Sequence, residues 1–127
     1  AVICLVSALS FHKLTTQVPH EISLAVSRNM RIPSLDYPPV KAYKFSVESF
    51  QAGIEKHKID GTMVQIYCPE KTLADCFKYR NKIGMDVVLE SLKLYLSTKK
   101  FDINKLLKYA RICRVAKIMK PYLEASL

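Results

Sequence analysis

Apolar residues change their spacing near Pro69 in this chain of 127 residues. Between residues 22 and 68 many of them alternate at an interval of about two, as in strands; after Pro69 they recur at three and four, as in helices. The alternation predicts strands at 22–26, 40–46, 54–59 and 63–68. We therefore expect an α+β domain with a small mixed or antiparallel sheet of about four strands, a largely buried N-terminal helix over 1–11, and a C-terminal group of three to four helices.

The clearest local signal is Asp60-Gly61, which lies between two extended runs. This dipeptide favours the positive φ angles of a two-residue hairpin turn, so we predict a β-hairpin over 54–68. Residues 28–39 predict an extended loop, because proline and the residue before it disfavour helix. The prolines of this segment are Pro33, Pro38 and Pro39.

Three signals divide the second half of the chain into helices. Pro69 suits a first helical turn and opens a helix predicted over 70–82, which Gly84 ends. A second helix is predicted over 85–96, where apolar residues recur at helical spacing. Asp102 can cap the start of a third helix.

The last helical segment cannot be one straight helix. The apolar residues of 103–110 and those of 115–123 differ in phase by about 120°. We therefore predict a break near Cys113 and a separate last helix from about Arg114. Pro121 favours that separate helix, or a kink if the helix is continuous.

A basic residue recurs at every third position of this C-terminal segment, and a spacing of three drifts by about 60° per step around a helix. One straight basic stripe is therefore excluded. Two interpretations remain open: solvated helix faces, or a surface for a polyanion or an acidic protein. The residues are Lys105, Lys108, Arg111, Arg114, Lys117 and Lys120.

Positive charge is concentrated in the helical half. The chain carries 20 Lys and Arg against 11 Asp and Glu, a net charge of +9. Residues 70–127 hold thirteen basic and six acidic residues, whereas residues 1–69 hold seven and five. Half of the residues are hydrophobic, so one folded domain over 1–127 is expected.

Cysteine spacing and the N-terminal residues predict the cellular compartment of the protein. Four cysteines stand 64, 8 and 37 residues apart, which fits neither a zinc site nor a dense disulfide framework. We expect a reducing, cytoplasmic location and no membrane partner. The first residues are apolar but too few for a bilayer span, and no basic segment precedes them as in a signal peptide. Because the chain opens inside an apolar run, we expect a fragment of a longer protein.

Motifs for catalysis are missing from the sequence. It has no Gly-x-Ser-x-Gly and no glycine-rich phosphate loop. His12, His20 and His57 lack a specific metal-ligand spacing. Asp36 with residues 55–58 only approaches the pattern of a metal-dependent nuclease. We predict no enzyme activity, no metal and no cofactor.

Asp75 lies in an apolar part of the helix predicted over 70–82. We expect it to be buried beside a basic group, with Arg80 as the candidate partner. A structural ion pair that holds helices together is the favoured interpretation.

Five segments carry a family resemblance: 7–21, 59–61, 67–84, 109–116 and 121–124. The most specific is 69–84, which reads PEKTLADCFKYRNKIG. Together they resemble the C-terminal domain of AbiEi-family type IV antitoxins, also described as transcriptional regulators of viral defence systems. The resemblance covers essentially the whole chain.

The resemblance implies a non-enzymatic antitoxin or regulatory domain of a bacterial type IV toxin–antitoxin, or abortive-infection, system. Its counterpart would be a nucleotidyltransferase-like toxin, neutralised directly or indirectly. Such antitoxins carry an N-terminal winged helix-turn-helix that binds DNA and represses their own operon, and residues 1–127 leave no room for it. The resemblance offers no catalytic residues. The alternative from another class is a basic nucleic-acid-binding or degenerate nuclease-like domain.

Overall fold

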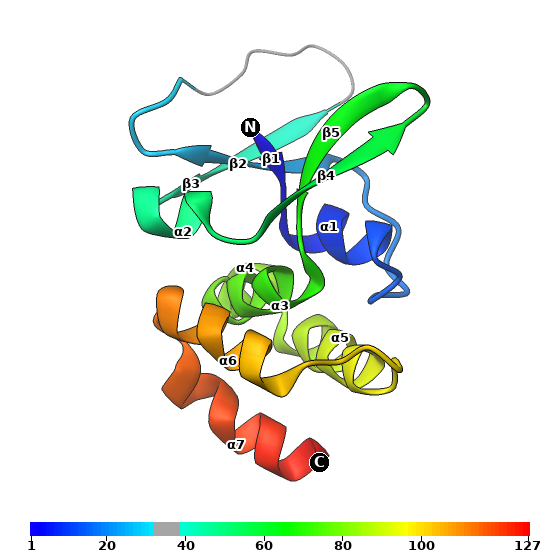
Figure 1. Ribbon diagram of the computed structural model, residues 1–127, viewed down its shortest axis with the longest axis vertical. Helices are drawn as coiled ribbons and strands as arrows, with labels where there is room; N and C mark the ends of the chain where they lie inside the picture. Colours follow the sequence, from blue (N-terminus) through cyan, green and yellow to red (C-terminus); the bar gives the residue numbers. More distant parts are fainter. Residues whose placement is uncertain (32–38) are drawn as a thin grey trace.

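The computed structural model describes residues 1–31 and 39–127 and has an α+β architecture. A five-stranded sheet lies above helices α3 to α7 in Figure 1, and α7 lies farthest from it. The strands are β1 (Val2–Ile3), β2 (Ile22–Ser27), β3 (Val40–Phe45), β4 (Ile54–Ile59) and β5 (Thr62–Tyr67). The helices are α1 (Leu5–Phe11), α2 (Val47–Gln51), α3 (Pro69–Lys78), α4 (Arg80–Ile83), α5 (Met85–Leu96), α6 (Ile103–Ile112) and α7 (Ala116–Ser126).

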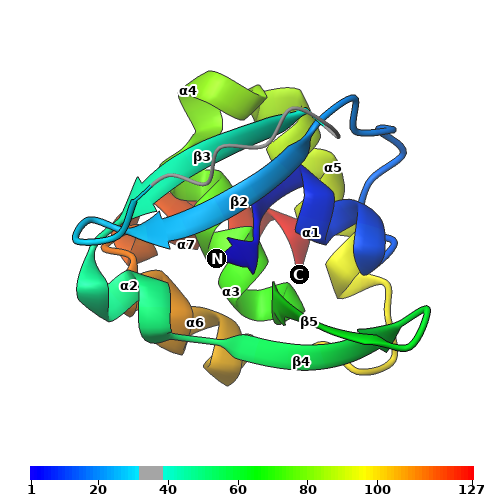
Figure 2. The ribbon, with the colours of Figure 1, turned by 90° about the horizontal axis from the view of Figure 1, so that it is seen from above.

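The sheet is mixed and has the order β3-β2-β1-β5-β4, which the view from above shows (Figure 2). Strand β1 pairs antiparallel with β2 and parallel with β5; β2 and β3 are parallel, and β4 and β5 are antiparallel. The predicted α+β class and mixed sheet are confirmed, with five strands instead of about four.

The additional strand lies inside the segment that the sequence predicts as a helix over 1–11. Val2 and Ile3 pair with Ala25 and Leu24 at the centre of the sheet, and the helix begins only at Leu5. Two residues are too few to show the alternation of a strand, so the apolar side chains of Val2 and Ile3 indicate an extension of the helix that follows. The prediction of helix for these first residues was wrong.

The predicted hairpin is confirmed. Ile59 pairs with Thr62 across Asp60 and Gly61, whose φ angles are 49° and 80°. Positive φ at both central residues is what a type I′ turn requires. The loop predicted over 28–39 lies mostly outside the described residues, as do Pro33 and Pro38.

The helix predicted over 70–82 is divided at Tyr79, while its end at Gly84 is confirmed. The Tyr79 ring packs against Tyr43 and Phe45 of β3, with centroids 5.4 and 5.8 Å away. This contact with the sheet is tertiary, so the periodicity of the helix does not reveal it. Tyr79 leaves helical geometry here, with φ −100° and ψ 23°.

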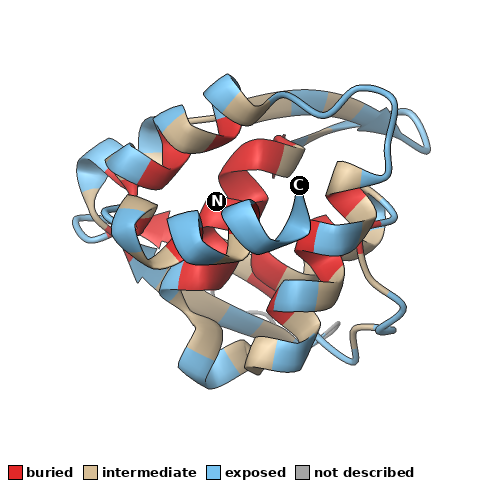
Figure 3. Ribbon diagram, turned by 90° about the horizontal axis from the view of Figure 1, so that it is seen from below, coloured by how far each residue is buried: buried red, intermediate tan, exposed pale blue. Residues whose placement is uncertain are grey.

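Helix α3 is the centre of the molecule. It contacts α1, α5 and α6, and its residues 70–77 are all buried. Seen from below, the buried residues face inward and the outer helix surfaces are exposed (Figure 3). The longest helix of residues 1–31 and 39–127 has 12 residues, and none has the length and apolar character of a membrane span.

Candidate functional site

The six basic residues of the C-terminal segment are all exposed. Lys105, Lys108 and Arg111 belong to α6, Arg114 lies in the link, and Lys117 and Lys120 belong to α7. No acidic residue occurs between positions 103 and 120. We call these six residues the basic surface.

The basic surface stands on two amphipathic helices. Helix α6 buries Leu106, Tyr109 and Ala110, and α7 buries Met119 and Leu123. The Lys105 N–H donates to Asp102 Oδ1 at 3.0 Å, which confirms the predicted cap of α6. The basic side chains occupy the remaining helix faces and so stand on a packed scaffold.

Helix α6 ends in a Schellman motif, which confirms the predicted break near Cys113. The Arg114 N–H donates to the Arg111 carbonyl at 3.1 Å, and the Val115 N–H donates to the Ala110 carbonyl at 2.8 Å. Arg114 has φ 62°, in the left-handed region where glycine is usual. Val115 is buried at this corner, and α7 begins at the next residue.

A hollow of about 550 Å³ lies at this corner. Its cationic lining comes from Arg111, Arg114 and Lys117, and its apolar lining comes from Ala116 and Ile118. Both Ala116 and Ile118 are half-buried and pack partly against the core. The corner therefore offers positive charge beside apolar surface.

Lys105 is exposed, but it also pairs with a buried carboxylate. Its Nζ lies 3.4 Å from Oε1 of the buried Glu70. Burial alone would lower the pKa of Lys105, but the nearby acidic groups, with Glu70 first among them, together outweigh burial and raise the pKa above its ordinary value. Among the described residues, the other five cations of the basic surface have no carboxylate within ion-pair distance.

Glu70 belongs to a network that the sequence analysis missed. The Tyr95 hydroxyl donates to Glu70 Oε2 at 2.6 Å and accepts a hydrogen bond from the Asp102 N–H at 2.7 Å. Burial, followed by the hydrogen bond to Glu70, raises the pKa of Tyr95. The network joins the start of α3, the end of α5 and the start of α6, and so fixes the helix that carries half of the basic surface.

The expected burial of Asp75 beside a basic group is confirmed, but its partner is Lys71 and not Arg80. Lys71 Nζ lies 2.6 Å from Asp75 Oδ2, and both side chains are buried. The two residues are four positions apart and share one face of α3. Arg80 follows the break at Tyr79, and its Nη1 donates to the Phe77 carbonyl instead.

The remaining groups around this pair are also buried. Lys71 Nζ lies 4.0 Å from the centre of the Tyr67 ring, and Cys113 Sγ donates to Asp75 Oδ1 at 3.3 Å. Burial raises the pKa of Asp75 while Lys71 opposes the shift. Burial also raises the pKa of Cys113, to about 12. The cluster is closed to solvent, so it stabilises the fold and offers no surface for a ligand.

His12 and His57 lie closer together in space than their sequence positions suggest. The rings of His12 and His57 have centroids 6.1 Å apart. His57 Nε2 lies 2.9 Å from Glu55, and His12 Nε2 lies 2.7 Å from the Tyr67 carbonyl. Within 1–31 and 39–127, no three His, Cys, Asp or Glu residues are placed to hold a metal. Asp36 lies outside the described residues.

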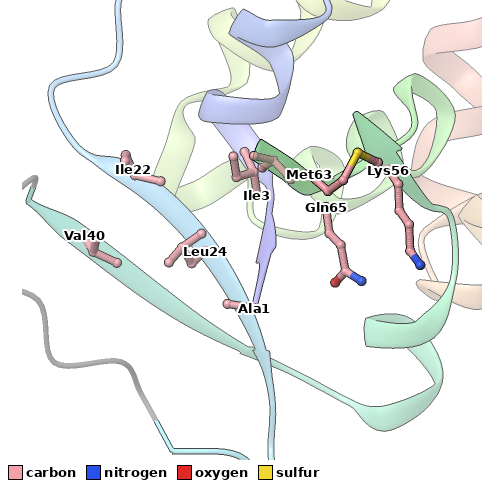
Figure 4. A pocket seen from close by; sticks show the side chains of 9 residues that line it. Ala1, Ile3, Ile22, Leu24, Val40, Lys56, Met63 and Gln65 are labelled. Atoms are coloured by element: carbon pink, nitrogen blue, oxygen red, sulfur yellow. The ribbon is translucent and has the colours of Figure 1, made fainter. Parts of the chain in front are cut away.

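A second hollow, of about 790 Å³, lies beside β1. Figure 4 shows side chains from all five strands around it. Ile3, Leu24 and Met63 give it an apolar lining, to which Lys56 adds one cation. It therefore presents far less charge than the corner of α6 and α7.

Comparison with protein-family models finds no match to this chain, and no curated protein matches it either.

Proposed function

We propose that this chain is a non-enzymatic antitoxin or regulatory domain of a bacterial type IV toxin–antitoxin system. It counteracts a nucleotidyltransferase-like toxin by binding, and it carries out no reaction. The observation that carries the proposal is the basic surface, with six exposed cations and no acidic residue between positions 103 and 120.

The physical basis is electrostatic complementarity. Five of the six cations have no carboxylate within ion-pair distance among the described residues, and such cations attract an acidic partner and favour its correct orientation. Because α6 and α7 stand on a packed core, little ordering of this scaffold is needed on binding. The sequence of residues 69–84, which resembles the antitoxin family, forms the central helix α3 and its continuation α4.

We infer that the domain is cytoplasmic. Operator binding would belong to a separate N-terminal winged helix-turn-helix of the full-length protein. All four cysteines are free and buried, as expected of a protein in a reducing compartment.

A basic nucleic-acid-binding domain is the second candidate. The net charge of +9 favours it, because cations bind the phosphate backbone regardless of base sequence. In that case affinity for unrelated duplex DNA or RNA would fall steeply with salt.

Co-expression tests the proposed function. Residues 1–127 are produced, without a winged domain, in cells that express the nucleotidyltransferase-like toxin encoded beside the gene. Restored growth is the expected result. Growth arrest in the presence of folded, abundant domain would contradict the proposal, and cleavage of RNA or DNA by the purified domain would contradict its non-enzymatic character.

A further inference from the structure

Two basic residues of this chain occupy a backbone position that normally suits glycine. Arg114 follows the end of α6 with φ 62°, and Lys13 follows the end of α1 with φ 60°. The Lys13 N–H donates to the Ser10 carbonyl, and the Leu14 N–H donates to the Leu9 carbonyl, so α1 also ends in a Schellman motif. A residue with a Cβ is strained in this left-handed conformation.

The surroundings of these two residues differ. Arg114 stands beside Arg111 and Lys117 at the charged corner hollow, whereas Lys13 lies in the link that follows α1. Strain that persists at a surface position is a reason to look for a functional role of the side chain. At the corner, the guanidinium of Arg114 extends from a position fixed by two backbone hydrogen bonds.

We propose that the corner of α6 and α7 anchors an acidic protein segment that carries one apolar side chain. Carboxylates of the segment pair with Arg111 and Arg114, and its apolar side chain packs on Ala116 and Ile118. Arg114 is the residue that determines specificity, because a guanidinium binds a carboxylate in a bidentate manner. This inference rests on the proposed function and names the chemistry of the partner surface.

The shape and composition of the corner favour a protein segment over a nucleic acid. Basic residues spaced by three drift by about 60° per step around a helix, and α6 and α7 are separate helices joined at Arg114, so these residues do not form one straight stripe. Single-stranded nucleic acids are also held by bases stacked on aromatic rings. Tyr109 is the sole aromatic residue between 103 and 120, and it is 8% exposed. Charged residues around an apolar centre are instead common in protein interfaces.

The test compares Arg114→Gly with Lys13→Gly, a matched control at the same backbone position of another helix. Each change removes one positive charge and relieves positive-φ strain. Both variants should keep their Tm or raise it by up to about 4 °C, since the loss of strain outweighs the added freedom of the unfolded chain. Binding is measured with a labelled acidic peptide that carries one central leucine, and with its serine counterpart.

We expect the leucine peptide to bind the wild-type domain more tightly than the serine peptide. Arg114→Gly should weaken that binding about tenfold, and Lys13→Gly should leave it unchanged. Arg114→Lys should recover part of the affinity, because lysine restores the positive charge but lacks the planar guanidinium that binds a carboxylate in a bidentate manner. Equal loss in both glycine variants, or tighter binding of duplex DNA than of the leucine peptide, would overturn the inference.

The growth assay separates failure of this inference from failure of the proposed function. If Arg114→Gly still restores growth as the wild type does, while reversal of Lys108, Arg111 and Lys117 abolishes it, the anchor at Arg114 is wrong and the proposed function stands. If the wild-type domain itself does not restore growth, the proposed function is wrong.

Discussion

Lys71 and Asp75 form an ion pair of 2.6 Å, one turn apart on the central helix α3, with side chains that are 0% and 1% exposed. Removing one partner of a buried pair leaves a charge without compensation, which is more damaging than replacing both partners. Asp75→Asn should therefore lower the free energy of unfolding by about 3–5 kcal/mol. Urea denaturation measures this, with the exposed Glu124→Gln as a control.

The double variant Lys71→Met with Asp75→Leu completes this test. It should recover most of the lost stability, since apolar residues of similar volume need no charge compensation. A change below about 1 kcal/mol in Asp75→Asn would show that the pair is not a main support of the core.

The raised pKa of Cys113 predicts a loss of stability at alkaline pH. Its ordinary value is 9.0, and burial raises it to about 12 in the folded protein. Between these values the unfolded chain releases the thiol proton while the folded protein keeps it, so stability falls as pH rises. Thermal unfolding between pH 8 and 11 should show the slope, and Cys113→Ser should reduce it. An equal slope in both proteins would contradict the assignment.

Gly53 and Gly61 both have φ 80°, but they differ in free space. A Cβ at Gly53 would lie 2.6 Å from Lys71 Cβ, whereas a Cβ at Gly61 would meet nothing within 4 Å. Gly61→Ala should cost about 1 kcal/mol from backbone strain alone. Gly53→Ala adds overpacking and should cost about 2–4 kcal/mol. Equal losses in chemical denaturation would show that the two sites do not differ as described.

Salt sensitivity tests whether the basic surface contributes to polyanion binding. Replacing Lys108, Arg111 and Lys117 together by Gln should lower the salt concentration at which heparin releases the domain. The control replaces three exposed lysines of the sheet by Gln, at Lys44, Lys56 and Lys58. Unchanged retention of the first variant would exclude these helix residues from electrostatic binding.

Much of the fold follows from local sequence signals. Asp60-Gly61 specifies a hairpin turn by its backbone preference, and the phase shift around Cys113 requires two helices. The short strand β1 and the break at Tyr79 depend on partners far along the chain, so no local period reveals them. In the candidate site, the exposure of the cations follows from the apolar periods of α6 and α7.

Two features, one in the basic surface and one in the buried ion pair, could be identified only from the structure. The left-handed backbone of Arg114 could not be predicted, because the usual glycine is absent from that corner. The pairing of Asp75 with Lys71 had a usable signal in their spacing of four. Arg80 is the partner expected from the sequence because the end of the helix at Tyr79 has no local signal.

Growth rescue by charge-reversed domains tests whether the basic surface is what neutralises the toxin. Cells that express the toxin receive either wild-type residues 1–127, a variant with Lys108, Arg111 and Lys117 changed to Glu, or a control with Lys44, Lys56 and Lys58 changed to Glu. All three proteins are matched for abundance and Tm. We expect the control to rescue growth as the wild type does and the basic-surface variant to fail. Full rescue by the basic-surface variant would show that these cations do not carry antitoxin function.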